Sequence, residues 1–251
     1  MAWTGKRSVR RLKKFFRGYL SSVFFVLYGL GSLAIGFGVL PVLVLFGSRV
    51  AHPMRMIIRA TYVVFVWLAD VAGLFRVSIA AEDLRKLKNT RGHVVVANHP
   101  SLIDIVILFS LLPESTGFAK AAAARNLFYS RVVKSTFIPN DNPAEALQEG
   151  INALKKGVNV IVFPQGTRTR QGETRKLHRG SANLSLRAGV PVLPVRIKMN
   201  FPVLGKGQPW YDVGDKTVEY KIEPGDVICP DEEPSYGAAQ RLTEKIGAAI
   251  N

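Results

Sequence analysis

The chain has 251 residues, enough for one full domain with an additional segment. Its single cysteine, Cys229, excludes an internal disulfide and a cysteine-rich metal site. The net charge of +16 is unevenly placed, because no acidic residue precedes Asp70. A basic segment of this kind suits an anionic partner, either a membrane surface or a nucleic acid.

The N-terminal third combines a basic arm with two apolar segments. The stretch 21–46 has no charge and is long enough to cross a bilayer, although its glycines and Pro41 are expected to break it. A second apolar stretch, 56–75, is interrupted by Arg59 and Asp70. We expect a membrane-associated helical pair, either a spanning hairpin or two segments within one leaflet. The arm consists of Lys6, Arg7, Arg10, Arg11, Lys13, Lys14 and Arg17.

Residues 76–251 alternate between strand-like and helix-like stretches, which predicts an α/β domain with a largely parallel central sheet flanked by helices. Strands are expected at 76–80, 93–97, 116–119, 158–163, 192–198 and 217–223. Helices are expected at 83–89, 103–112, 121–134, 143–156, 180–188 and 236–250. We therefore divide the chain into residues 1–75, the arm and the helical pair, and residues 76–251, the α/β domain.

Polar residues follow the apolar run 94–97 at the predicted carboxyl edge of the sheet, where ligands of α/β proteins bind. An imidazole from His99 and a carboxylate from Asp104, brought together there, make a base and its orienting partner. An alternative fits the same residues equally well. Ser101 and Asp104 have the spacing of a helix capping box, and His99 alone can be an ordinary loop residue.

A second stretch favours the catalytic interpretation. The strand-like run 158–163 ends in Phe163-Pro164-Gln165-Gly166-Thr167-Arg168, and 190–195 reads Val-Pro-Val-Leu-Pro-Val. With Asn98-His99-x4-Asp104, these motifs resemble, in order and spacing, the glycerolipid acyltransferase family of lysophosphatidate acyltransferases. The resemblance covers roughly residues 75–230. It departs at Gln165, where the family has Glu, and at Asn140 and Asp141, near which the family carries an arginine suited to the acceptor phosphate.

The resemblance implies acyl transfer from a thioester to a hydroxyl of a lysophospholipid-like acceptor. His99 would be the base, because the pKa of an imidazole lies near neutral pH, and Asp104 would orient it. Backbone N–H groups of Gly166 and Thr167 would stabilise the oxyanion, and Arg168 would bind a phosphate through its guanidinium fork. The remaining substrate-binding candidates are Asn98, Lys120 and Gln165.

No bound cofactor or metal is expected, since an acyl-CoA or acyl carrier protein thioester serves as co-substrate. The expected partners are membrane phospholipids, the acyl donor and the acceptor, but no nucleic acid. The expected location is a bacterial inner membrane with the catalytic domain on the cytoplasmic side. Residues 138–141, 178–180 and 206–211 look similar to a branch linked to aryl polyenes and other special lipids. Two alternatives are a membrane-tethered binding protein and an inactive scaffold in which Gln165 marks lost activity.

Overall fold

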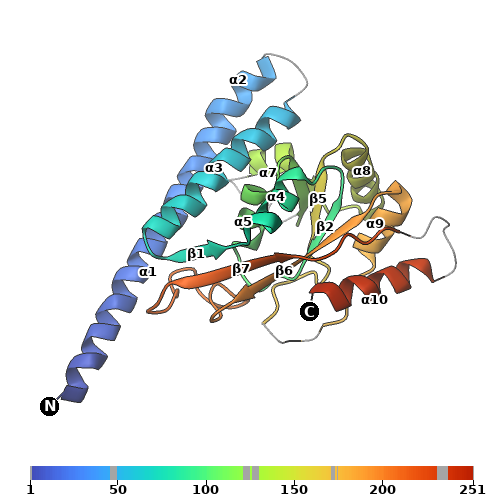
Figure 1. The fold of residues 1–251 in the computed structure, drawn as a ribbon. Coiled ribbons are helices and arrows are strands. Elements are labelled where there is room, and N and C mark those ends of the chain that lie inside the picture. Colours follow the sequence, from blue (N-terminus) through green and yellow to red (C-terminus); the bar gives the residue numbers. More distant parts are fainter. Residues whose placement is uncertain are drawn as a thin grey trace.

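The computed structural model describes residues 2–45, 50–120, 125, 130–170, 173, 175–230 and 237–250, with side chains from residue 11 onward. In this part of the chain a seven-stranded sheet has the order β1-β7-β6-β2-β5-β3-β4 (Figure 1). Its strands are β1 (Phe75–Ser78), β2 (Val94–Ala97), β3 (Ser115–Ala119), β4 (Ile138–Pro139), β5 (Asn159–Val162), β6 (Val192–Met199) and β7 (Val218–Pro224). Every pair of neighbouring strands is parallel except β6 and β7. The prediction of a largely parallel α/β sheet is thus confirmed.

Helices cover both faces of this sheet and extend it at one edge (Figure 1). They are α1 (Ala2–Ala34), the π-helical turn η1 (Ile35–Val39), α2 (Leu40–Leu45), α3 (Ala51–Val71), α4 (Ala81–Asn89), α5 (Asp104–Leu111), α7 (Ser130–Thr136), α8 (Pro143–Lys155), α9 (Gly180–Ala188) and α10 (Ala238–Ile250). Most bounds lie within two residues of the predicted ones. Much of the helix predicted at 121–134 lies outside the described residues, and the two-residue strand β4 was not predicted.

The core follows the period-two alternation of side chains along the strands. In β2, Val95 and Ala97 pack toward α3, α5 and α7, whereas Val94 and Val96 pack toward α8, α9 and α10. All four side chains are fully buried. A strand buried on both faces leaves only its ends for polar chemistry, so β2 directs His99 to the carboxyl edge of the sheet.

The two N-terminal segments form a helical hairpin. Helix α1 continues through η1 into α2, and α3 returns antiparallel along it (Figure 1). The predicted break does not occur. Pro41 has no N–H to donate to a carbonyl one turn earlier, and the chain accommodates this with the π-helical turn that precedes it.

Polar contacts attach the hairpin to the α/β part. The Arg17 guanidinium donates to four carbonyls, those of Gly73, Leu74, Gly214 and Lys216, at 2.6–3.3 Å. At the other end of the hairpin, Arg55 donates to Glu114 at 2.6 and 2.8 Å.

Burial opposes the charged form of Glu114. The hydrogen bonds and charges of His52 and Arg55 outweigh this penalty, and they lower the pKa of that carboxyl below its usual value. Together with Arg17, this ion pair docks both ends of the hairpin on the sheet layer.

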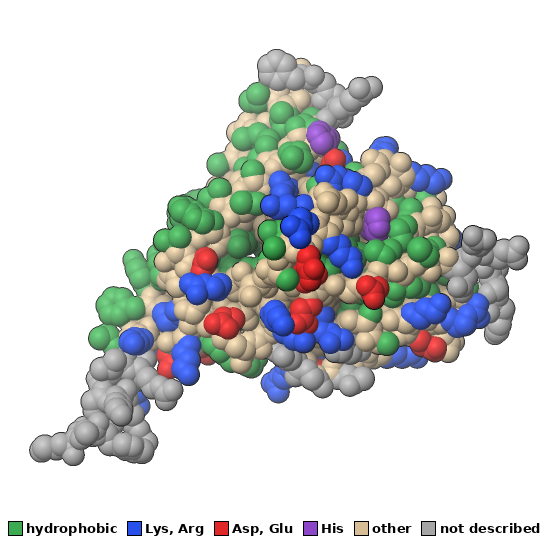
Figure 2. Space-filling model, in the orientation of Figure 1, with side chains coloured by type: hydrophobic (Ala, Val, Ile, Leu, Met, Phe, Trp, Pro, Cys, Tyr) green, Lys and Arg blue, Asp and Glu red, His purple; other side chains and the backbone are tan. Residues whose placement is uncertain are grey.

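The outer side of the hairpin is apolar. Figure 2 shows hydrophobic side chains along the edge formed by α1 and α3, whereas charged side chains gather over the α/β part. Among the described residues, the continuous helix 11–45 is long and apolar enough to cross a membrane. Large side chains stay exposed along α1 and α2, including Val26, Leu30 and Leu45, and along α3, including Val64 and Trp67. An apolar surface of this extent is typical of membrane association.

The exposed apolar face predicts how the full chain leaves a membrane fraction. We expect release by detergent and retention in high salt, because salt screens charge but does not weaken burial of apolar side chains. The measurement is the distribution of the chain between pellet and supernatant after each wash. Complete release by salt alone would mean that the basic arm, and not the apolar face, holds the protein.

Candidate active site

His99 and Asp104 lie at the turn between β2 and α5. The Nδ1 atom of His99 is 2.7 Å from Oδ2 of Asp104, and the carboxylate is fully buried, while 19% of the imidazole is exposed. Since a carboxylate only accepts hydrogen bonds, Nδ1 carries the proton and Nε2 is left as the basic nitrogen. The turn therefore presents one nitrogen of His99 in a defined tautomer.

Ser101 holds this carboxylate from the other side. Its N–H donates to Oδ2 of Asp104 at 2.7 Å, and its hydroxyl donates to Oδ1. The predicted capping box is only half present. The carboxylate does reach back to the N–H of Ser101, but the N-cap of α5 is Ile103, and the serine hydroxyl serves Asp104 instead.

Tyr220 of β7 lies behind this group and is also fully buried. Burial, and then the negative charge of Asp104, raise the pKa of Tyr220 far above its usual range, whereas the nearby Ser101 hydroxyl lowers it by less. The phenol therefore stays neutral at physiological pH. Because the Tyr220 phenol is neutral, the titratable group paired with the Asp104 carboxylate is His99.

The motif after β5 lies directly against His99, because β2 and β5 are neighbouring parallel strands. The ring of Phe163 stacks on the imidazole with a centroid distance of 4.1 Å and an angle of 16°. The N–H of Thr169 donates to the carbonyl of His99 at 2.9 Å. The structure thus brings together the two loops that carry the sequence motifs.

One of the two predicted oxyanion donors is already engaged. The N–H of Gly166 donates to the carbonyl of Phe163 at 3.1 Å, so it is engaged within its own turn. The N–H of Thr167 has no hydrogen-bond partner among the described residues. Thr167 therefore keeps the predicted capacity to donate to an oxyanion.

Gly166 itself has a left-handed backbone, with φ of +67°, and a Cβ added there would lie 3.2 Å from the imidazole of His178. The main-chain N–H of His178 also donates to the carbonyl of Pro164 at 2.8 Å. The sequence does not place His178 at the site, because nothing in its local pattern indicates that the chain returns to the motif. The structure thus adds a second imidazole beside the Gly166 turn.

Two of the predicted substrate contacts bind the protein backbone. The Asn98 amide donates to the carbonyl of Ile197 at 2.8 Å and accepts from its N–H at 2.6 Å. Nη1 of Arg168 donates to the carbonyls of Leu204 and Gly205 at 2.8 and 3.0 Å. Asn98 thus joins the end of β2 to β6. Arg168 uses one nitrogen to fix the 204–205 loop, and the described residues offer no partner to the rest of its fork.

Gln165 and Lys120 remain without hydrogen-bond partners among the described residues. Only 6% of Gln165 is exposed, and its buried Oε1 accepts no hydrogen bond. A buried amide oxygen without a donor is costly, which makes it a natural acceptor for a hydroxyl or amine of a ligand. Lys120 follows β3, is exposed, and lies at the same carboxyl edge of the sheet.

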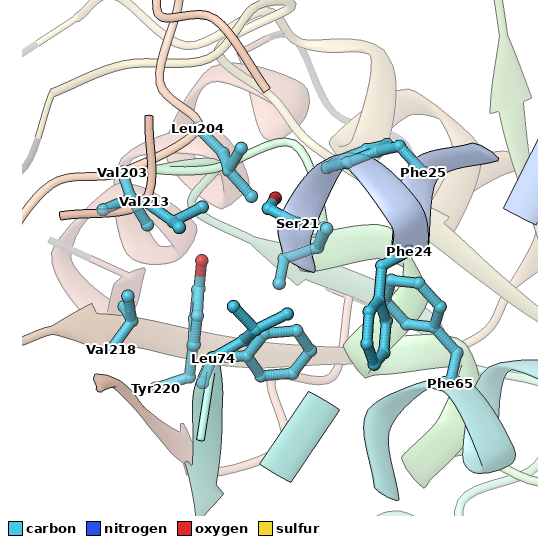
Figure 3. A pocket seen from close by; sticks show the side chains of 12 residues that line it. Ser21, Phe24, Phe25, Phe65, Leu74, Val203, Leu204, Val213, Val218 and Tyr220 are labelled. Atoms are coloured by element: carbon cyan, nitrogen blue, oxygen red, sulfur yellow. The ribbon is translucent and has the colours of Figure 1, made fainter. Parts of the chain in front are cut away.

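An apolar pocket lies on the hairpin side of the turn (Figure 3). Side chains of α1, α3, β1 and β7 meet there with the 203–213 loop, and Ile103 and Tyr220 connect the pocket to the His99–Asp104 turn. The side chains fill most of it and leave a cavity of about 20 Å³. The lining residues in Figure 3 include Phe24, Phe25, Phe65, Leu74 and Val218.

The contact between Gly166 and His178 predicts a difference between two glycine substitutions. Gly166→Ala and Gly157→Ala each place a side chain at a positive φ, of +67° and +79°. Each is expected to lower the free energy of unfolding by about 1 kcal/mol. Only Gly166→Ala also displaces an imidazole, since Gly157 has open space around its Cβ position, and this adds about 0.5 kcal/mol.

Thermal unfolding of both variants, each with and without His178→Ala, measures this difference. The additional loss in Gly166→Ala should disappear in the His178→Ala background. An additional loss that persists there would show that the two residues do not touch.

Comparison with known proteins gives consistent results. A family model described as "Acyltransferase" matches residues 78–198. The 1-acyl-sn-glycerol-3-phosphate acyltransferase of Borreliella burgdorferi is 26% identical over 57% of this chain and 57% of its own length. That of Pseudomonas aeruginosa is 29% identical over 52% of each chain. The chain thus spans about half the length of the curated relatives it matches.

The fold also matches a solved structure along nearly the whole chain. The crystal structure of the 1-acyl-sn-glycerophosphate acyltransferase from Thermotoga maritima aligns with a TM-score of 0.65 and 24% identity, covering 96% of this chain and 94% of that one. This likeness includes the N-terminal hairpin and concerns the fold alone. The family model and the curated relatives, together with the motif residues at the carboxyl edge of the sheet, support a place for this chain among the glycerolipid acyltransferases.

Proposed function

We propose that this chain transfers a fatty acyl group from an acyl thioester to a hydroxyl of a lysophospholipid-like acceptor, with His99 as general base. The observation that carries the proposal is the 2.7 Å pair of His99 and buried Asp104, with the loop after β5 packed against it. The curated relatives named as 1-acyl-sn-glycerol-3-phosphate acyltransferases support the reaction type.

The reaction needs one base and no enzyme nucleophile, because a thioester is already activated. Nε2 of His99 takes the proton as the acceptor oxygen attacks the thioester carbonyl carbon. The tetrahedral intermediate then forms the new ester as the C–S bond breaks, and the imidazolium returns the proton to the departing thiolate. Asp104 stabilises the imidazolium in between, and the N–H of Thr167 is the proposed donor to the oxyanion.

The apolar pocket of Figure 3 is the proposed place for an acyl chain. It lies between the hairpin and the His99–Asp104 turn, and its lining is almost entirely aliphatic and aromatic. Since the cavity is only about 20 Å³, an acyl chain enters by displacing side chains such as Phe24 and Phe25. Acyl-CoA and acyl carrier protein both supply such a chain as a thioester, so either can be the donor.

The acceptor side of the site is proposed to include Gln165, Arg168 and Lys120. The buried Oε1 of Gln165 suits a hydroxyl or amine donor of the acceptor. The nitrogens of Arg168 that do not hold the 204–205 loop are available to a phosphate, and Lys120 adds a positive charge at the same edge. We place the enzyme at a bacterial inner membrane, with this edge on the cytoplasmic side where acyl thioesters occur.

Removing the base tests the mechanism. His99→Ala should lower the initial rate of acyl transfer by about 100-fold or more, because general base catalysis contributes at least that factor. Asp104→Asn should cost less if the imidazole remains placed well enough. The measurement is ester formation from a thioester and a lysophospholipid, with thermal unfolding confirming that each variant is folded. A rate for folded His99→Ala close to that of the wild type contradicts the proposed mechanism.

Restoring the family residue at position 165 tests the acceptor site. Gln165→Glu adds a negative charge and removes the amide donor, so the ranking of acceptors should change while hydrolysis of the thioester alone stays similar. The measurement is the initial rate against several acceptors at a fixed thioester concentration. An unchanged ranking would mean that position 165 does not contact the acceptor. Activity that appears only in the variant would identify the natural chain as an inactive scaffold.

A further inference from the structure

A groove of about 600 Å³ runs along the first part of α1, where the helix meets the turn at Tyr211 and Asp212. On the helix it is lined at a spacing of three and four residues, which is the signature of a single helical face. These lining residues are Arg11, Lys14, Phe15, Gly18, Tyr19 and Ser22.

None of them belongs to the candidate active site. The groove lacks the paired histidine and carboxylate of that site among its described lining residues, so we consider a binding role for it.

The groove carries an excess of positive charge. Lys14 pairs with Asp212 at 2.9 Å, and both side chains are well exposed. Arg11 has no ion pair or hydrogen bond among the side chains that the structure describes. Among the described residues that line the groove, Arg11 and Lys14 carry a positive charge and Asp212 carries a negative one. The remaining charge fits a ligand that carries a negative group such as a phosphate.

Aromatic rings border the charged end of the groove. Phe15, Tyr19 and Tyr211 are 69%, 65% and 54% exposed, and Trp210 stands next to Tyr211 at a ring-centroid distance of 5.6 Å. Exposed aromatic rings among basic residues are typical of the level of a bilayer where head groups meet acyl chains. In a lipid site the apolar part of each ring contacts acyl chains, while the tyrosine hydroxyls remain in the head-group layer.

The same helical face continues into the uncharged part of α1. Val26 and Leu30 continue the face of Phe15 and Tyr19, each eleven residues further along the helix, and both are exposed. From Lys14 to Val26 the helix rises about 18 Å, which matches the roughly 15 Å of hydrocarbon in one leaflet. A phosphate at Lys14 therefore leaves the acyl chains of the same molecule alongside the helix as far as Val26.

We propose that this groove binds one molecule of an anionic membrane phospholipid that is not a substrate. Arg11 and Lys14 contact its phosphate, Tyr19 and Tyr211 flank its glycerol, and its acyl chains lie along the exposed face of α1. The proposal goes beyond the acyl transfer reaction and does not depend on it, because binding is measured without an acyl donor.

Trp210 provides the measurement, because it borders the groove. Full-length protein with Trp3→Phe and Trp67→Phe is placed in phosphatidylcholine vesicles that contain a minority of phosphatidylglycerol. Two vesicle preparations are compared. In one the phosphatidylglycerol, and in the other the phosphatidylcholine, carries acyl chains brominated near the carboxyl end, and bromine quenches the emission of a nearby tryptophan. Brominated phosphatidylglycerol should quench Trp210 more than its mole fraction predicts, whereas brominated phosphatidylcholine should quench it less.

Two single substitutions separate the groove from general surface charge. Arg11→Gln should lower the preference for phosphatidylglycerol about five-fold, the usual effect of one cation at an anionic surface. Lys13→Gln removes the same charge two residues away, at a position that does not line the groove, and should leave most of the preference. Circular dichroism confirms that both variants stay helical.

Three results would overturn the proposal. They are equal quenching by both brominated lipids, an equal loss in Arg11→Gln and Lys13→Gln, and displacement of the brominated lipid by inorganic phosphate. The second would assign the effect to diffuse surface attraction, and the third would assign the groove to a soluble phosphate.

Discussion

The site depends on one buried carboxylate, that of Asp104, and on the three hydrogen bonds it accepts from His99 and Ser101. A buried charge is tolerated only when hydrogen-bond donors surround it. The positions of His99 and Ser101 are therefore fixed together by the one carboxylate that both bind. Asp104 is also the first residue of α5, where the helix dipole favours a negative charge. One residue therefore fixes the tautomer of His99, the shape of the turn and the start of a core helix. Any change at Asp104 affects all three at once.

Sequence alone predicted those parts of the molecule that depend on local pattern. Alternating and continuous apolar runs located β2 and β5, and the parallel sheet placed the turn with His99 beside the motif that begins at Phe163. The tasks of Asn98 and Arg168 were not predictable in this way. Their partners are main-chain atoms of Ile197, Leu204 and Gly205, and main-chain atoms leave no trace in a sequence. A motif thus identifies residues that matter without telling which of them touch substrate.

The basic arm illustrates the same limit. Charge composition indicated an arm directed at an anionic surface, but Arg17 is used inside the protein and Lys14 is shared with Asp212. Seen from the sequence, Arg11, Lys14 and Arg17 are equivalent cations on one helix. Their roles diverge because the helix packs against the loop before β7, which brings carbonyls to Arg17 and leaves Arg11 outward. Tertiary contacts, and not composition, decide which charges remain for a partner.

The Arg17 contacts also have a consequence for the order of assembly. Two of its four acceptor carbonyls, those of Gly214 and Lys216, lie 197 and 199 residues further along the chain. Helix α1 is therefore synthesised long before two of the carbonyls that secure it. Until then it must persist as a helix without those partners, and an apolar medium permits this because a helix satisfies its own backbone. Early residence in lipid would thus hold α1 ready for the sheet that closes on it.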